Sequence, residues 1–136
     1  MTDAFDADVL IFASKGDARG KKAESALRGA EASIGSLLLL AETLVKPGRT
    51  GDDAELDELA RLLVHIDLKP VDEEIATAAV SLGVKYGLKA ADAVHLATAV
   101  VWGAERFHTN NRSDFGRVVD EIEIVFGGDT TQVLLG

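Results

Sequence analysis

Apolar residues fill one stretch of the chain, residues 88–103, on every side of a helical wheel. Ala, Val and Leu make up most of LKAADAVHLATAVVWG, which is typical of a helix buried on nearly all sides. Its only acidic residue, Asp92, lies near the N-terminal end. An ionised carboxylate is costly to bury unless it is paired or binds a metal, but the helix dipole also stabilises acids in a first turn. Both interpretations of Asp92 remain open at this point.

Short strands are predicted between the helices of this chain. The expected strands are a first one ending near Asp6, then residues 31–36, 66–71, 105–109 and 122–126. Because strands and helices alternate, the pattern predicts the α/β class with a mostly parallel sheet.

Capping residues and helical periodicity predict where the helices begin and end. One is expected after Asp8 as N-cap, one with Ala23, Ala26 and Leu27 inward, and one from Ser36 to a stop at Pro47–Gly48. The stretch 52–66 reads as amphipathic, with Leu56, Leu59, Leu63 and Ile66 inward, and the stretch 73–86 is expected between Asp72 and Gly87. TNNRSDF, residues 109–115, is expected to be a loop.

Length and composition predict a single globular domain over residues 1–136. Hydrophobic residues make up 47% of the 136 residues, and the net charge is −9. The absence of cysteine excludes disulfides and thiolate metal sites, so a bound metal would be a hard cation held by oxygens. The acidic N-terminus is unlike a signal peptide, and the longest apolar stretch is too short for a membrane span, which predicts a cytoplasmic protein.

Isolated acids recur where parallel strands would end. Asp6 follows the first strand, Asp92 begins a buried helix, and Glu42 shares an apolar helical face with Leu38 and Val45. Lys46, four residues after Glu42, is the alternative explanation for that acid, as an ion-pair partner. Carboxylates gathered at one edge repel one another unless they share a cation or protons. Mg²⁺ or Mn²⁺ fits such a set, and would activate water and stabilise charge at a phosphate.

These segments resemble the PIN domains, and in particular the VapC-like ribonuclease toxins of bacteria and archaea. The resemblance rests on FDADVLI, LLLLAETL, LKAADAVHLATAVVWGA and FHTNNRSDF, in that order along nearly the whole chain. It implies a three-layer α/β/α sandwich with a central mostly parallel sheet. It also implies a Mg²⁺- or Mn²⁺-dependent endoribonuclease that cuts RNA, is often dimeric, and is often neutralised by a small antitoxin.

Carried over position by position, the resemblance assigns the first three acids to Asp6, Glu42 and Asp92. Thr109 matches the family's hydroxyl residue, and Asn111 stands where the family has its fourth acid. Because an amide supplies a neutral oxygen, the site would hold metal more weakly. Asp8 or Asp114 are possible replacements, although Asp8 is expected to cap a helix and Asp114 to face solvent or cap the next helix.

His95 and a basic segment have both structural and functional interpretations. His95 lies three residues after Asp92 and would either hydrogen-bond that carboxylate or be an ordinary core histidine. A basic run, which contains Lys15, Arg19, Lys21 and Lys22, would either face solvent or contact the RNA backbone.

Two other functions compete with the nuclease. Asn111 favours a PIN-like domain that has lost its chemistry and binds a protein or RNA. DADVL also resembles the start of haloacid-dehalogenase phosphatases, in which the first Asp is a nucleophile, but Leu10 stands where that motif has Thr or Val.

Overall fold

A five-stranded parallel sheet forms the centre of the computed structural model, which describes residues 1–116 and 119–126. The strands are β1 (Thr2–Phe5), β2 (Ala32–Ser36), β3 (Asp67–Lys69), β4 (Arg106–Thr109) and β5 (Glu123–Phe126). Their order is β3-β2-β1-β4-β5, and every neighbouring pair is parallel. All carboxyl ends therefore meet at one edge of the sheet. The predicted α/β/α sandwich is confirmed.

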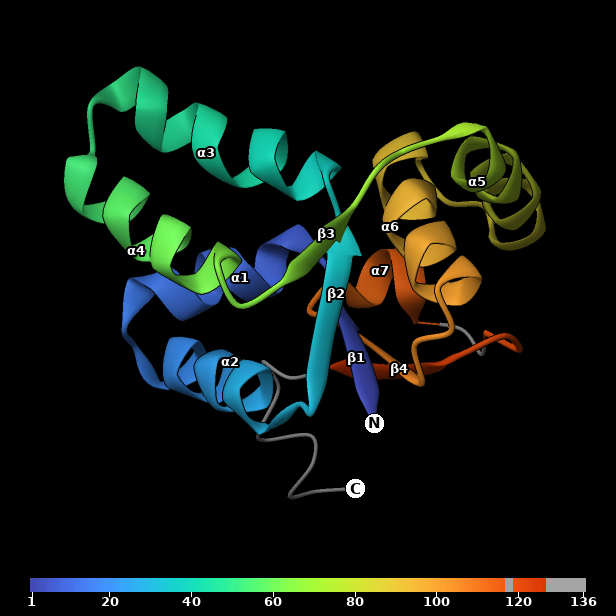
Figure 1. The fold of residues 1–136 in the computed structure, drawn as a ribbon, viewed down its shortest axis with the longest axis horizontal. Helices are drawn as coiled ribbons and strands as arrows, with labels where there is room; N and C mark the ends of the chain where they lie inside the picture. The colour runs from blue at the N-terminus through green and yellow to red at the C-terminus, as the bar shows by residue number, and fades with distance from the viewer. Residues whose placement is uncertain (117–118, 127–136) are drawn as a thin grey trace.

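The helices of the described residues cover both faces of the sheet (Figure 1). They are α1 (Ala7–Lys15), α2 (Ala18–Gly29), α3 (Leu38–Thr50), α4 (Asp53–Leu63), α5 (Glu73–Tyr86), α6 (Ala90–Val101) and α7 (Arg112–Phe115). Helices α1 to α4 lie on one side of the sheet, and α5 and α6 lie on the other. None of the helices in the described ranges is long and apolar enough to cross a membrane.

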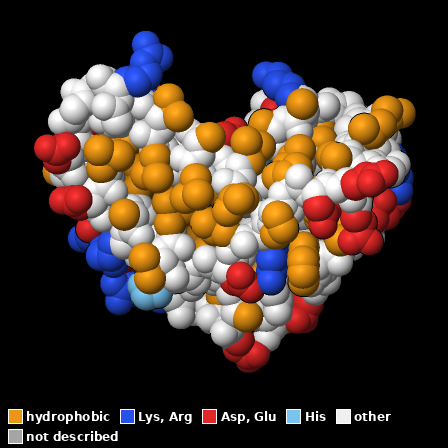
Figure 2. All heavy atoms as spheres, turned by 45° about the horizontal axis from the view of Figure 1, so that its top comes forward, with side chains coloured by type: hydrophobic (Ala, Val, Ile, Leu, Met, Phe, Trp, Pro, Cys, Tyr) orange, Lys and Arg blue, Asp and Glu red, His pale blue; other side chains and the backbone are white. Residues whose placement is uncertain are grey.

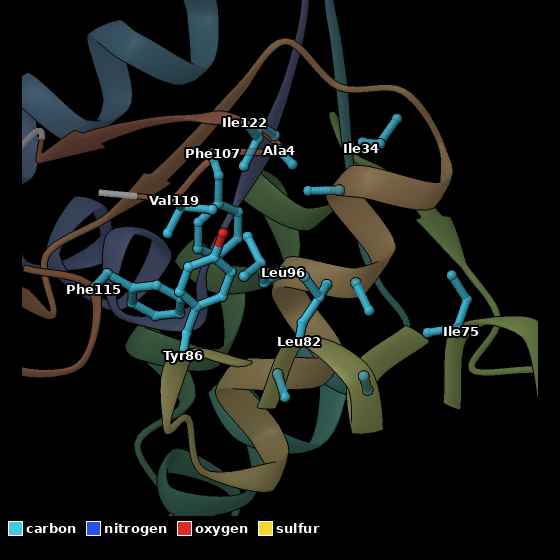
Figure 3. Close-up of a cluster of buried hydrophobic side chains, with 14 residues drawn as sticks. Ala4, Ile34, Ile75, Leu82, Tyr86, Leu96, Phe107, Phe115, Val119 and Ile122 are labelled. Carbon is cyan, nitrogen blue, oxygen red and sulfur yellow. The ribbon is translucent and has the colours of Figure 1, made fainter. Parts of the chain in front are cut away.

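Two hydrophobic cores fix these layers because alternate residues of the strands face opposite sides. Phe5 packs with Leu10, Leu39 and Leu59 on the α1–α4 side. Ala4 and Phe107 face the α5–α6 side, where Figure 3 shows them among the side chains of Leu82, Tyr86, Leu96 and Phe115. As expected, α6 lies in this second core, with Leu96, Ala97 and Ala99 fully buried. The apolar stretch that opened the sequence analysis is thus the helix that supports Asp92.

Three local predictions were wrong. Helix α1 begins at Ala7 with Asp6 as its N-cap, so Asp8 lies in the first turn instead of capping it. Helix α3 continues through Pro47 to Thr50, because proline removes one hydrogen bond but already has a helical φ; it ends at Gly51, where φ is 72°. The expected 109–115 loop contains the short helix α7, which Asn111 caps by accepting a hydrogen bond from the Asp114 amide.

Other local predictions were confirmed. Asp72 caps α5 by accepting a hydrogen bond from the Ile75 amide, and Gly87 ends that helix with φ of 67°. In the amphipathic helix α4, Leu59 and Leu63 are buried as expected, whereas Leu56 is only half-buried and Leu62 is buried in addition. The expected C-terminal tail, residues 127–136, lies outside the described residues.

Candidate active site

Asp6 occupies the carboxyl end of the central strand β1, at the base of the candidate site. Its side chain is 5% exposed, accepts a hydrogen bond from the Thr109 hydroxyl at 2.9 Å, and accepts another from the Ala7 amide at 2.8 Å. The Asp6 amide donates to the His108 carbonyl at 2.9 Å, which locks β1 to β4 at this level. Burial raises the pKa of Asp6 above its ordinary value. The protein therefore holds a carboxyl group rigidly where its charge is poorly solvated.

Asp8 is the second acid at this edge, in the first turn of α1. Its two carboxylate oxygens each accept from the Asn110 amide at 3.2 Å, so Asp8 ties α1 to the segment after β4. Burial, followed by repulsion from Asp6, raises the pKa of Asp8 to about 7. Asp8, which was expected to cap a helix and was named as a possible replacement for the fourth acid, thus lies close enough to Asp6 for the two charges to repel.

Asp92 and Asp114 form a third acidic group, carried by the first turn of α6 and by α7. Their carboxyl groups interact, so the pKa of Asp92 is raised while that of Asp114 is lowered. Burial, together with the interaction with Asp114 and repulsion from Asp6, raises the pKa of Asp92 to about 7. The pKa of Asp114 is lowered by hydrogen bonds from Asp92 and Asn111. Asp114 is only half-buried, and the N-cap of α7 is Asn111, so of the two expectations for Asp114 the helix cap was wrong.

Glu42 reaches the same region from α3. It contacts Nε2 of the buried His95, whose side chain also lies 4.0 Å from Asp6 Oδ1. The alternative that Lys46 pairs with Glu42 was wrong, because His95 of α6 is the partner that the structure records. Of the two interpretations of His95, the structure shows a buried histidine whose Nε2 contacts Glu42.

Asn111, at the position of the family's fourth acid, uses its side chain within α7. Its Oδ1 accepts from the Asp114 amide at 3.2 Å and from the Ser113 hydroxyl at 2.8 Å, and its Nδ2 donates to Asp114 Oδ2 at 2.7 Å. The Asn111 amide donates to the Thr109 hydroxyl at 3.1 Å. The structure therefore places Asp6, Glu42, Asp92, Thr109 and Asn111 in one region at the carboxyl edge of the sheet.

Comparison with known protein families identifies this arrangement. The family model described as PIN domain matches residues 4–121. The chain belongs to the PIN-domain family. The chain matches none of the curated protein sequences.

Several solved structures share the fold of this PIN domain. A toxin–antitoxin complex from Klebsiella pneumoniae has a chain that is 28% identical, with a TM-score of 0.70 over 90% of this chain and 99% of that one. The DNA-bound VapBC from Salmonella typhimurium is 15% identical, with a TM-score of 0.73 over 92% and 97% of the two chains. VapC20 of Mycobacterium tuberculosis, a toxin that cleaves the sarcin–ricin loop, is 20% identical, with a TM-score of 0.65 over 85% and 96%. The resemblance to PIN domains and to the VapC-like toxins is confirmed.

The described acidic side chains of this PIN domain are of the type that binds a divalent cation, but they are not arranged around a single point. Among the described residues, no three acidic or histidine side chains surround one point as the ligands of an ion would. However, burial and mutual repulsion raise the pKa values of Asp6, Asp8 and Asp92, so these oxygens lack a compensating positive charge. Oxygen donors of this kind are those that Mg²⁺ and Mn²⁺ prefer.

A buried polar network on β1 and β4, next to the site, was not predicted from the sequence. Asp3 is 1% exposed and receives two hydrogen bonds from Arg106, at 3.0 and 2.9 Å, and a contact from His108 Nε2 at 3.1 Å. His108 also stacks on Phe5 with ring centroids 4.7 Å apart, and burial lowers its pKa. The signal was present in the sequence, because Asp3 and Phe5, like Arg106 and His108, are two residues apart and therefore share one face of their strand.

The basic segment of the sequence analysis follows the end of α1 and runs along α2. Lys15 forms an ion pair with Glu55 at 3.5 Å, and the side chain of Arg19 lies outside the described part of the structure. Because α2 leads into the first residue of β2, its C-terminal end lies at the amino edge of the sheet, opposite the acids.

Proposed function

We propose that this PIN domain is a metal-dependent endoribonuclease that hydrolyses RNA, and the toxin of a VapBC-type toxin–antitoxin pair. One observation carries the proposal: in a member of this family, the buried Asp6 after β1, the half-buried Asp92 of α6 and the exposed Glu42 of α3 gather at the carboxyl edge of the sheet. The printed function of VapC20, cleavage of the sarcin–ricin loop, supports RNA as the substrate class. The toxin–antitoxin complexes among the structural relatives support a small antitoxin as partner. A homodimer in the cytoplasm is part of the same proposal.

Asp6, Glu42 and Asp92 would hold Mg²⁺ or Mn²⁺, and Asp114 would supply a further carboxylate through its interaction with Asp92. A bound divalent ion lowers the pKa of water and stabilises negative charge on a phosphodiester. The chain's own residues fix the geometry of the acids. Thr109 is fully buried and uses its hydroxyl both as donor to Asp6 and as acceptor from the Asn111 amide. We therefore assign Thr109 a positioning role for Asp6, with no direct contact to RNA.

Asn111 would act in the same indirect way. Its amide oxygen and nitrogen are committed to Ser113 and Asp114, so Asn111 orients Asp114 toward Asp92. In this proposal Asp114 takes over the task of the family's fourth acid, and the amide keeps it in place without adding a charge.

Cleavage of a mixed RNA pool tests the proposal. Purified protein, free of any partner, is incubated with Mn²⁺, with Mg²⁺ and with a chelator. We expect metal-dependent cleavage that Asp92→Asn abolishes while the circular dichroism spectrum is unchanged. Asp57→Asn, which removes an exposed acid from α4, is the matched control and should cut like the parent. Full activity of Asp92→Asn would overturn the assignment.

A second candidate function is a binding module without chemistry. Two contacts favour it: the Asn111 side chain is hydrogen-bonded to Asp114, and Glu42 contacts His95. Both contacts use carboxylate oxygens that a metal ion would need. In that case Mg²⁺ and Mn²⁺ leave the melting temperature unchanged, since an ion stabilises a protein only by binding its folded state. Asn111→Asp would separate the two functions. It places a charge against Asp114, so in a nuclease its melting temperature should rise with Mn²⁺ by more than that of the parent.

A further inference from the structure

An RNA strand that approaches this site meets an acidic protein. The chain carries a net charge of −9, and the acids of the site add local repulsion to a polyanion. Nucleic-acid affinity comes largely from lysine and arginine on phosphates, so the position of available cations decides where a strand can lie. The proposed nuclease function, on which this inference rests, therefore needs positive charge beside the acids.

Several lysine and arginine side chains of this protein already pair with acids. Within the described side chains, the Lys and Arg residues that form ion pairs with acids are Lys15, Arg28, Arg61, Lys69, Lys85 and Arg106. Such a cation must give up its carboxylate before it can bind a phosphate. The remaining lysines are better suited to the task.

Two exposed lysines lie one helical turn from an acid of the site. Lys46 follows Glu42 by four residues on α3, so the two share a helical face. Because Glu42 contacts His95 instead, no ion pair to Lys46 is found in the described ranges. Lys89 is the N-cap residue of α6, three residues before Asp92, and makes no side-chain capping bond. Its charge acts on Asp114 and helps to lower the pKa of that carboxyl.

The two lysines belong to opposite walls of the site. Helix α3 lies on one side of the sheet and α6 on the other, with the carboxyl edge between them (Figure 1). Figure 2 shows a hollow between these two sides, with acidic side chains at its base and Lys or Arg side chains on both rims. A cation on each rim with carboxylates below is the charge pattern that suits a phosphodiester backbone crossing the hollow.

We propose that Lys46 and Lys89 bind the phosphates of an RNA strand on either side of the acidic site. The two contacts hold the strand across the hollow, so that the phosphodiester between them faces Asp6 and Asp92. The backbone contacts would then come from the two rims, instead of from the basic segment that contains Lys21 and Lys22.

Binding of a fluorescent single-stranded RNA oligonucleotide tests this directly. It is measured by anisotropy in the Asp92→Asn protein with chelator present, so that no cleavage interferes. Each phosphate contact to a single strand contributes about 0.7 to the slope of log affinity against log salt. We therefore expect Lys46→Ala and Lys89→Ala each to reduce the slope by about 0.7 and to weaken binding about fivefold at 0.1 M salt.

Charge-matched variants make the outcome specific. Lys46→Arg and Lys89→Arg should bind like the parent because they keep the charge. Arg61→Gln removes one positive charge from α4, where Arg61 is paired with Glu24 and Glu58, and should leave affinity and slope unchanged. Unchanged binding in both alanine variants, or a loss carried by Lys21→Ala and Lys22→Ala instead, would overturn the inference. If the wild-type protein neither binds nor cuts RNA, the proposed function itself fails.

Discussion

Asp8 offers a test of the electrostatic strain at the candidate site that does not depend on any enzymatic assay. Its pKa is raised from the ordinary value of 3.8 to about 7 by burial and by repulsion from Asp6. The folded protein therefore keeps its proton over a pH range in which the unfolded chain has lost it. The contribution of Asp8 to the free energy of unfolding is fully present below pH 3.8 and is lost as the pH rises through 7.

The free energy by which ionised Asp8 destabilises the fold follows from its two pKa values. A rise from 3.8 to about 7 corresponds to about 4 kcal/mol of destabilisation once Asp8 is ionised. Asp8→Asn removes that cost, keeps one oxygen to accept from the Asn110 amide, and loses about 0.5 kcal/mol of favourable interaction with the α1 dipole. Because the side chain is only partly buried, we expect a net gain of about 2 kcal/mol at pH 8, or about 6–10 °C in melting temperature.

The assay is urea denaturation from pH 5 to pH 8 in the presence of a chelator. Asp8→Asn should be more stable than the wild-type protein at pH 8, and the advantage should disappear toward pH 5. Asp57→Asn, on the exposed side of α4, is the control and should track the wild-type curve. An Asp8→Asn protein with the wild-type pH dependence would refute the reasoning.

Two further predictions concern the scaffold. Asp3→Ala leaves buried His108 and half-buried Arg106 without their partner. It should therefore lower the free energy of unfolding, measured by urea titration, by about 3 kcal/mol. A loss below about 1 kcal/mol would contradict the structural role of this network. Gly20→Ala would place a Cβ 2.3 Å from the Phe12 carbonyl oxygen, so it should lower the free energy of unfolding by about 1–3 kcal/mol. Gly29→Ala is the control, because its Cβ would meet no atom within 4 Å, and it should not destabilise the protein. Equal melting temperatures of the two variants would argue against this close approach of α1 and α2.

The layer structure was predictable because local patterns agree with the final fold. The alternation of strands and helices, the caps at Asp72 and Gly87, and the apolar stretch that became α6 all depend on residues close in sequence. The helix was predicted to stop at Pro47, but α3 continues to Thr50. A proline within a helix costs stability without ending the helix when burial of one helical face, here with Leu39 and Pro47, compensates.

The site was only partly predictable for a different reason. The family resemblance located Asp6, Glu42 and Asp92, but the partner of each acid comes from a distant segment. His95 meets Glu42 from 53 residues away, and Thr109 meets Asp6 from 103 residues away. One sequence contains no direct signal for such pairs, so the hydrogen-bond partners of these acids emerged only from the fold.

The pairing of β1 with β4 has a consequence for synthesis of the chain. The ribosome makes β1 well before its neighbour β4, because Thr109 of β4 lies 103 residues after Asp6. Until the ribosome has made β4, Asp6 lacks the hydrogen bond from Thr109, and β1 has a partner strand only on its β2 side. A nascent chain that ends before β4 therefore contains Asp6, Glu42 and Asp92 but lacks the strand that holds Asp6 in place.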